Sequence, residues 1–117
     1  MIQSKLFATV RKPAPNVSVI DLQGEVTGQV EDELMDAFAQ ASNGSTKTIL
    51  LNFSELEYMN SSGIGLLVTL LIRTRRQKQN LQAYGLSDHY QEIFTLTRLN
   101  EAIGIYGSEA EALAGKS

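Results

Sequence analysis

The sequence predicts a single-domain α/β fold in which a mixed, largely parallel β-sheet of about five strands packs against four helices. Two observations predict this class. Short segments rich in branched apolar residues alternate with longer segments of helical periodicity, in the order β-β-α-β-α-β-α-β-α. Alternation of this kind is typical of parallel strands joined by right-handed helical connections. We expect one domain over residues 1–117, with its core at about residues 6–113, since no repeat or linker interrupts the chain.

The first two strands are predicted to form a hairpin. The first covers residues 6–11 and ends at residues 12–15, where two nearby prolines disfavour a helix and favour a bend. The second covers residues 17–22, in which β-branched residues are dense. It ends at residues 24–28, Gly-Glu-Val-Thr-Gly, a loop rich in turn-forming residues.

The next two elements are a helix and a buried strand. Five apolar residues share the i, i+4, i+7, i+8, i+11 spacing of one helix face: Val30, Leu34, Ala37, Phe38 and Ala41. Asn43 and Gly44 end this helix, because both tolerate the left-handed conformation. Residues 48–53 are almost continuously apolar, which predicts a strand buried on both faces, as in parallel sheets.

A longer apolar helix follows. After a short polar connection and a turn at residues 60–63, we expect it to run from Ile64 to about Gln79. Its core stripe is predicted to contain Ile64, Leu67, Val68 and Leu71, widened by Leu66 and Leu70. Its final turns are basic and complement the negative end of the helix dipole: Arg73, Arg75, Arg76 and Lys78.

The last third of the chain contains shorter elements. Residues 81–84 form a strand that stops at Gly85, and residues 88–96 form a helix capped by Ser87 or Asp88. The inward side of this helix is predicted to contain Tyr90, Ile93, Phe94 and Thr97. Residues 103–106 form the last strand. Ser108 caps a helix that runs through Leu113, and residues 114–117 are expected to fray.

Composition and charge exclude several classes of protein. The chain is 43% hydrophobic and 20% charged, which is ordinary for a soluble domain, and it has no cysteine. A net charge of -3 argues against direct nucleic-acid binding. Residues 1–7 lack the features of a signal peptide, and the apolar run at residues 64–72 is about half a membrane span. We therefore expect a cytoplasmic protein without membrane insertion.

No pattern of catalytic or metal-ligating residues stands out. The only histidine is His89, read as a surface residue beside a helix cap, and no Gly-x-Ser-x-Gly surrounds Ser61. No acidic or histidine cluster has metal-ligand spacing, so we expect no metal and no cofactor. The glycines at residues 63 and 65 weakly suggest a phosphate-binding turn, but the third glycine of a dinucleotide motif is missing. A small nucleotide-binding or hydrolytic enzyme stays as a minor alternative.

The segment Asn60-Ser-Ser-Gly63 is the most distinctive feature of the sequence. It lies at the predicted start of a helix, where free backbone N–H groups favour anions. Asn60 or a serine can cap this helix, and Gly63 and Gly65 can let it pack tightly on the sheet. Two adjacent hydroxyl groups are more than a cap requires. A phosphoryl group at this helix end would be stabilised, which suggests a modification site.

Residues 52–66, Asn-Phe-Ser-Glu-Leu-Glu-Tyr-Met-Asn-Ser-Ser-Gly-Ile-Gly-Leu, resemble the signature of STAS domains, especially of bacterial anti-sigma factor antagonists. In that family an Asp-hydrophobic-x-x-hydrophobic segment precedes Asp-Ser-Ser-Gly and an apolar helix. Residues 24–28 resemble a second landmark of the family, and the order of elements matches over residues 6–113. Asn52 and Asn60 stand where the family has aspartate.

The resemblance implies a protein-binding switch in transcription regulation. The unphosphorylated domain would bind an anti-sigma factor that is also a serine kinase and so release a sigma factor. Ser61, with Ser62 as the alternative, would accept the phosphate, and a PP2C-type phosphatase would remove it. The implied partner face consists of Thr27, Gly28, Asn60, Ser61, Ser62, Gly63 and Ile64. STAS domains that act as unphosphorylated scaffolds of stress complexes, or as accessory subunits of lipid-transport ATPases, are the alternative.

Overall fold

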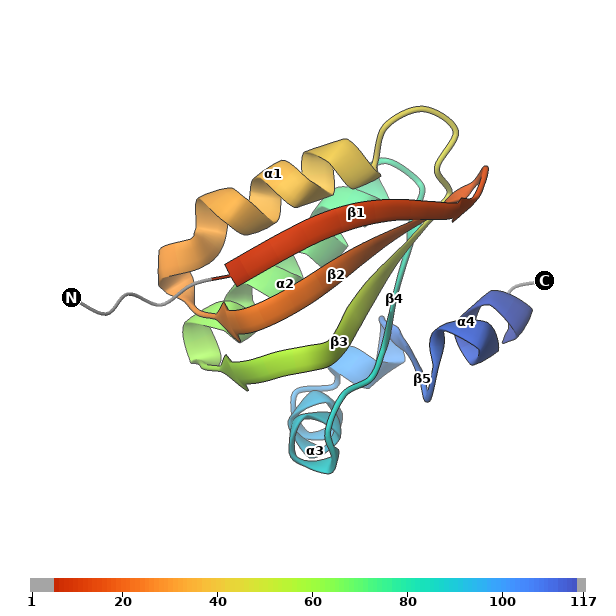
Figure 1. Ribbon diagram of the computed structural model, residues 1–117. Helices are drawn as coiled ribbons and strands as arrows, with labels where there is room; N and C mark the ends of the chain where they lie inside the picture. The colour runs from red at the N-terminus through yellow and green to blue at the C-terminus, as the bar shows by residue number, and fades with distance from the viewer. Residues whose placement is uncertain (1–5, 116–117) are drawn as a thin grey trace.

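Five strands form one sheet in the computed structural model, which describes residues 6–115. Strand β1 (Leu6–Ala14) pairs with β2 (Val17–Val26) in antiparallel fashion. The next pairs are parallel and join β2 to β3 (Thr48–Met59), β4 (Asn80–Tyr84) and β5 (Gly104–Tyr106). The order of strands in the sheet, β1-β2-β3-β4-β5, repeats their order along the chain (Figure 1). The predicted α/β class with a mixed sheet is confirmed.

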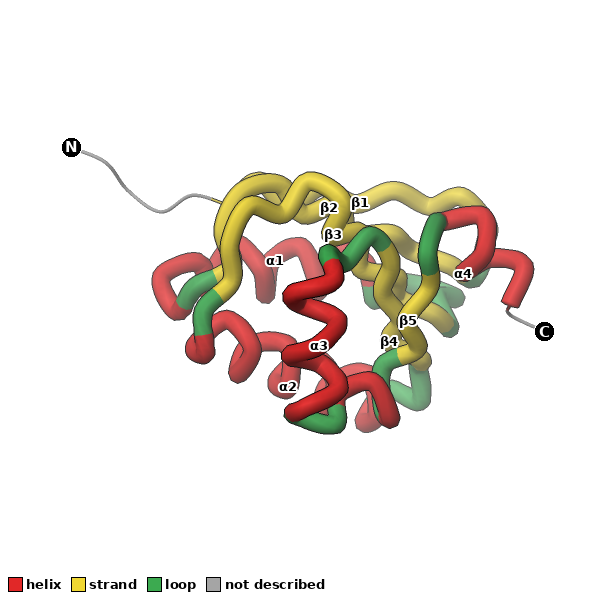
Figure 2. The backbone as a smooth tube through the Cα atoms, turned by 90° about the horizontal axis from the view of Figure 1, so that it is seen from below, coloured by secondary structure: helices red, strands yellow, loops and turns green. Residues whose placement is uncertain are grey.

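Four α-helices connect or follow the strands: α1 (Glu31–Ala41), α2 (Ser61–Arg76), α3 (Asp88–Leu96) and α4 (Glu109–Gly115). Helices α1 and α2 lie together on one side of the strands (Figure 2). Two short 3-10 helices, Gly28–Val30 and Leu99–Glu101, were not predicted because each is a single turn with no periodicity of its own.

The main core lies between the sheet and helices α1, α2 and α3. All five residues of the predicted α1 face are buried. From α3, only Phe94 is fully buried, and its ring meets Phe53 edge to face with 6.3 Å between ring centroids. A smaller apolar cluster on the other face of the sheet joins Val19, Leu50 and Tyr84 to Ala112 of α4.

The strands are longer than the sequence predicts. Strand β3 continues to Met59 through residues 54–59, which were expected to be a polar connection. These residues are paired with the end of β2, in which Glu25 is opposite Tyr58 and Val26 opposite Met59. Backbone pairing therefore outweighs the low β-propensity of a polar segment whose outward side faces water. Strand β1 likewise extends past Pro13, which an edge strand tolerates at a register shift.

Helix α2 also differs from the prediction at both ends. It begins at Ser61, three residues earlier than expected, and ends at Arg76, after which Lys78 adopts a positive φ of 60°. The prediction that Val68 lies in the core is wrong, because its side chain is 39% exposed. Thr97 is exposed as well and does not belong to the inward side of α3.

Both chain ends fall partly outside the described residues. The structure does not describe residues 1–5, on which the prediction of a missing signal peptide mainly depends, or Lys116 and Ser117. Ala114 and Gly115, which were expected to fray, belong to α4. Within residues 6–115 no helix is long and apolar enough to cross a membrane.

Candidate functional site

Asn60 connects the end of strand β3 to the start of α2. Its side-chain Oδ1 accepts a hydrogen bond of 2.9 Å from the backbone N–H of Gly63, and its carbonyl oxygen accepts one from the N–H of Ile64. The backbone N–H of Asn60 donates to the carbonyl oxygen of Val26 at 3.3 Å. Of the alternatives that the sequence left open, Asn60 is therefore the N-cap.

The first turn of α2 rests directly on the last residue of β2. A Cβ atom placed on Gly63 would lie 2.0 Å from the carbonyl oxygen of Val26, so no larger residue fits without moving the helix. Gly65, by contrast, is exposed and has no neighbouring atom within 4 Å of such a Cβ. The expectation of tight packing is confirmed for Gly63 and wrong for Gly65.

The two serines at the start of α2 are both exposed but differ in their surroundings. A Cβ on Gly28 would lie 3.3 Å from the Cβ of Ser62, so Ser62 faces the loop after β2. Ser62 lines a hollow of about 390 Å³ on this side of the helix. Ser61 does not line it. Its hydroxyl therefore lies outside the hollow, on a surface that another protein can reach.

The hollow brings together four residues of the predicted partner face: Thr27, Gly28, Asn60 and Ser62. Three further residues complete its lining, namely Glu25, Gln29 and Tyr58. Sequence reasoning missed these three because Glu25 and Tyr58 meet only through the pairing of β2 with the unpredicted end of β3. Of the remaining predicted residues, Gly63 is buried and Ile64 packs partly against the core.

Thr27 shapes this site rather than offering a contact surface. Its side chain is 7% exposed, and its Oγ1 accepts a hydrogen bond of 3.3 Å from the N–H of Gln29. The carbonyl oxygen of Thr27 also accepts from the N–H of Val30 at 3.2 Å. Thr27 therefore holds the single helical turn that places Gly28 beside Ser62.

The electrostatics at the start of α2 allow an added anion. The free N–H groups of the first helical turn and the positive end of the helix dipole favour negative charge there. No lysine or arginine lines the hollow, and its one charged side chain is the half-buried Glu25. A phosphoryl group on Ser61 would thus be stabilised by the helix, while it would make this face more negative for an approaching partner.

Within residues 6–115 the only histidine is far from forming a pair with the serines at the start of α2, since its contacts lie on α3. His89 is exposed at the start of α3, where its ring meets that of Tyr90 edge to face with 4.9 Å between centroids, and no hydrogen bond joins it to either serine. No group of three or more potential metal ligands occurs among the described residues.

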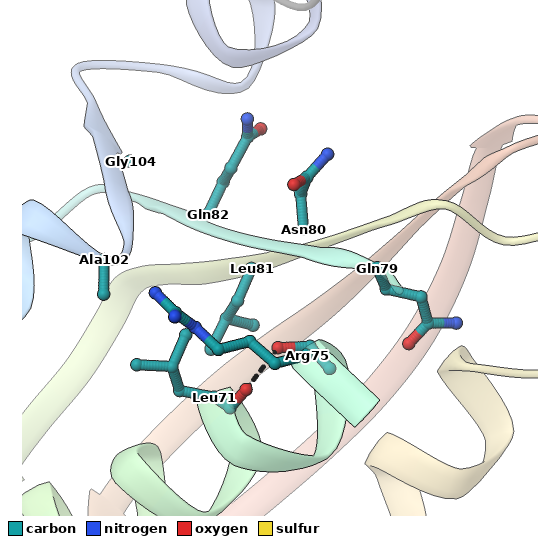
Figure 3. Close-up of a pocket in the computed structure, with 9 residues that line it drawn as sticks. Leu71, Arg75, Gln79, Asn80, Leu81, Gln82, Ala102 and Gly104 are labelled. Carbon is teal, nitrogen blue, oxygen red and sulfur yellow. Dashed lines mark hydrogen bonds between the residues drawn. The ribbon is translucent and has the colours of Figure 1, made fainter. Parts of the chain in front are cut away.

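A second hollow, of about 280 Å³, lies at the other end of α2 (Figure 3). Leu81 points from β4 toward α2, and Leu71 and Arg75 of α2 lie on that same side of the strand. Asn80 and Gln82 point away from β4 on the opposite side. The polar groups do not converge on one point, which a specific small-molecule site requires. We therefore place the candidate site at the start of α2.

A polar network lies on the face of the sheet that α4 covers. It explains why asparagine stands at position 52, where the STAS pattern has aspartate. Asn52 Nδ2 donates to Asp21 Oδ1 at 2.7 Å, and Arg11 Nη2 donates to the same oxygen at 2.9 Å. Arg11 also reaches Glu109 of α4 at 2.8 Å, and the hydroxyl of Tyr84 donates to Glu109 at 3.0 Å. An aspartate at position 52 would lack the N–H that faces Asp21, so this network requires the amide.

These hydrogen bonds shift the pKa values of the groups involved. The Arg11 guanidinium holds the pKa of Asp21 and that of Glu109 below their usual values, and it outweighs partial burial in both cases. Burial, reinforced by the hydrogen bond to Glu109, raises the pKa of Tyr84 to about 12. The network thus fixes α4 to β1, β2 and β4 with one cation between two ionised carboxylates.

The fold and the site define a small α/β domain with an exposed hydroxyl group at a capped helix start. Sequence comparison agrees with this description. The family described as "Mlab, STAS domain" matches residues 10–106, so the chain belongs to the STAS domain family. The anti-sigma-B factor antagonist of Staphylococcus aureus (strain NCTC 8325 / PS 47) is 27% identical over 93 residues, which cover 79% of this chain and 86% of that protein.

Solved structures share the fold at low sequence identity. The anti-sigma factor antagonist SpoIIAA in its unphosphorylated form has a TM-score of 0.71 at 19% identity and covers 92% of this chain and 94% of its own. The Bacillus cell fate determinant SpoIIAA in the phosphorylated form has a TM-score of 0.66 at 23% identity, with coverages of 92% and 97%. A sulfate transporter family protein from Wolinella succinogenes has a TM-score of 0.76 at 18% identity, with coverages of 89% and 87%.

Proposed function

We propose that this protein is a cytosolic anti-sigma factor antagonist that is switched by phosphorylation of Ser61. In its unphosphorylated form it binds an anti-sigma factor with serine kinase activity and so releases a sigma factor for transcription. A PP2C-type phosphatase restores the binding form. The protein acts by binding and catalyses no reaction itself. The observation that carries the proposal is the exposed Ser61 hydroxyl at the first position of α2, inside a STAS domain.

The position of Ser61 suits a reversible modification. A phosphate adds about -1.5 to -2 charges and considerable bulk. At Ser61 this group meets the positive end of α2 and solvent, so the domain stays folded. At Ser62 it would face Gly28 and share the hollow with the carboxylate of Glu25. Ser61 is therefore the better acceptor of the two.

The proposed partner face surrounds this acceptor. Its surface is formed by the predicted residues Gly28, Asn60, Ser61, Ser62 and Ile64, together with Glu25, Gln29 and Tyr58 from the same hollow. The predicted residues Thr27 and Gly63 are buried and support this face from below. A phosphate in the middle of such a face opposes binding by like-charge repulsion and desolvation, which cost several kcal/mol in protein interfaces. One modification can then separate the two proteins without unfolding either.

The test is phosphorylation by the cognate kinase with ATP, followed by intact-mass measurement. We expect one added phosphate on the natural sequence and on Ser62→Ala, and none on Ser61→Ala. Each variant changes one exposed hydroxyl of the same helical turn, so the two serve as matched controls. Equal phosphorylation of Ser61→Ala would remove Ser61 from the proposal.

A second candidate function is a constitutive scaffold or accessory subunit of a stress complex or a lipid-transport ATPase. Asn60 favours it, since the negative charge that the family places before the acceptor serine is missing here. The likeness to a sulfate transporter family protein also shows the fold outside anti-sigma factor antagonists. The affinity of Ser61→Asp for the partner separates the two: a large loss supports the switch, and an unchanged affinity supports the scaffold.

A further inference from the structure

The outer edge of strand β1 is open over its first half. β1 pairs with β2 on one side, and no described strand lies on the other. An edge strand presents unpaired N–H and C=O groups unless charged residues, proline or a covering element protect it. Here Arg11, Lys12 and Pro13 protect the end of the strand, but residues 6–10 contain no charge and no proline.

A groove runs along this open edge. Leu6, Phe7, Ala8 and Thr9 of β1 form one wall, and α1, which lies beside β1 in Figure 1, forms the other. The groove has a volume of about 270 Å³, and its α1 side is made by Glu33, Asp36, Ala37 and Gln40. These four residues have the i, i+3, i+4, i+7 spacing of a single helix face, and buried Ala37 keeps the groove open between strand and helix.

The groove is acidic. The carboxylates of Glu33 and Asp36 are exposed, and neither forms an ion pair with any residue in the part of the chain that the structure describes. Among residues 6–115, no lysine or arginine lines the groove. A cationic side chain that entered it would meet two carboxylates that have no ion-pair partner within residues 6–115.

The opposite face of the sheet at this edge carries one exposed apolar side chain, that of Phe7. Leu6 and Ala8 pack toward the main core, and Phe7, which alternates with them, points to the other face and is 62% exposed. An added strand would place alternate side chains on these two faces. Residues beside α1 would meet the carboxylates, and the residues between them would meet the ring of Phe7.

We propose that residues 6–10 of β1 bind an extended segment of a partner protein in which basic and apolar residues alternate. The segment adds a strand to the sheet edge, so that its main-chain groups form hydrogen bonds with β1. Its side chains alternately contact the α1 side and the Phe7 side of the sheet. Its lysine or arginine residues face Glu33 and Asp36, and its apolar residues cover Phe7.

A second copy of this chain fits the edge poorly. Antiparallel pairing of two β1 strands has a two-fold axis perpendicular to the sheet, which places both α1 helices on the same side. Glu33 and Asp36 of one copy would then face the same residues of the other across the junction. Four carboxylates, with no basic partner in the groove among the described residues, oppose such a dimer.

The full chain, labelled with ¹⁵N, is titrated with the blocked peptide acetyl-Thr-Lys-Val-Lys-Val-Lys-Thr-amide. We expect NMR shift changes and slowed amide hydrogen exchange at residues 6–10 and shift changes at residues 33–40. A peptide with glutamate in place of lysine is expected not to bind. Affinity is expected to fall as salt rises, because the recognised charges are exposed.

Charge-reversed variants give the decisive comparison. Glu33→Lys with Asp36→Lys should weaken binding by at least about tenfold. The matched control, Glu92→Lys with Glu101→Lys, makes the same change in net charge at exposed positions outside the groove and should leave affinity unchanged. Circular dichroism verifies that both variants are folded.

Three results would overturn the proposal: equal affinity of the two variants, no binding of the lysine peptide, or binding without slowed exchange in β1. Concentration-dependent protection of β1 without peptide, with a dimer in sedimentation, would assign the edge to a second copy instead. The proposal does not depend on the switch at Ser61, because Ser61 does not line the groove. The Ser61→Asp variant should accordingly bind the peptide normally.

Discussion

Gly63 and the carbonyl group of Val26 are in such close contact that α2 can begin only with a glycine at this position. A Cβ atom on Gly63 would lie 2.0 Å from the carbonyl oxygen and 2.8 Å from the carbonyl carbon of Val26. The same carbonyl oxygen accepts the hydrogen bond from the N–H of Asn60. The glycine thus brings the helix start, with its cap and its exposed serine, against the end of β2.

We predict that Gly63→Ala destabilises the domain by about 2–4 kcal/mol, since a backbone carbonyl cannot rotate away from the added methyl group. Urea unfolding followed by circular dichroism measures this loss. Gly65→Ala is the matched control. Its methyl group enters open space in the same helix, so stability should rise by about 0.5–1 kcal/mol. Similar effects of the two substitutions would contradict the close contact at Gly63.

The cap of α2 gives a second prediction. Asn60→Ala removes the acceptor for the N–H of Gly63 and should cost about 1 kcal/mol in the free energy of unfolding. Asn60→Asp keeps an acceptor oxygen and places a negative charge at the helix start, which should stabilise by about 0.3–1 kcal/mol at neutral pH. Thermal unfolding at low and high salt distinguishes the two contributions, because salt screens only the charge.

Asn52→Asp should destabilise the protein although aspartate is the family residue there. The substitution replaces the donor that faces Asp21 at 2.7 Å by a second carboxylate oxygen. We expect a loss of about 1–3 kcal/mol at pH 7 that shrinks in acid as one carboxyl group takes up a proton. Adding Asp21→Asn should restore the missing donor and recover part of the stability. Unchanged stability of the single variant would show that the amide is not required.

Acid should weaken the attachment of α4. The pKa values of Asp21 and Glu109 are lowered from 3.8 and 4.5 in the folded protein, so their pairs with Arg11 stabilise it fully above those values. This stabilisation is lost as the pH falls through the lowered folded pKa values. Because the pairs are partly exposed, we expect about 1 kcal/mol or less from each. Arg11→Gln should flatten the dependence of stability on pH below about 5.

Alkali should act through Tyr84. Its pKa is raised from 10.0 to about 12, so the unfolded chain loses its phenolic proton first and stability falls between these two pH values. Tyr84→Phe removes this titration and should give a flatter stability curve above pH 10. If the natural protein and Tyr84→Phe lose stability in parallel there, other groups are responsible.

Much of the fold followed from local patterns. The apolar spacing of α1 identified five buried residues correctly, and Asn60 was recognised among the capping candidates. Patterns failed where a contact distant in sequence decides the outcome. Residues 54–59 are polar yet form a strand, because β2 offers them a pairing partner. Val68 was assigned to the core, but the contact of Gly63 with β2 turns Leu66, Leu67 and Leu70 inward and leaves Val68 outside.

The same limit applies to the candidate site. Ser61 and its neighbours are consecutive in sequence and could be selected from the motif. Glu25 and Tyr58 could not, because their place beside Ser62 depends on how β2 and β3 are aligned. Two shifts of register between these strands, near Asp21 and Gly24, set that alignment, and no local pattern indicates them.

The sheet in which strand order equals chain order has a consequence for synthesis of the protein. Each strand pairs with the strand made immediately before it, so no strand has to wait for a distant segment of the chain. The β1–β2 hairpin can form first and then serve as a template on which β3, β4 and β5 are added one at a time. Loop closure between neighbouring strands costs less entropy than pairing across the whole chain, which favours rapid folding during translation.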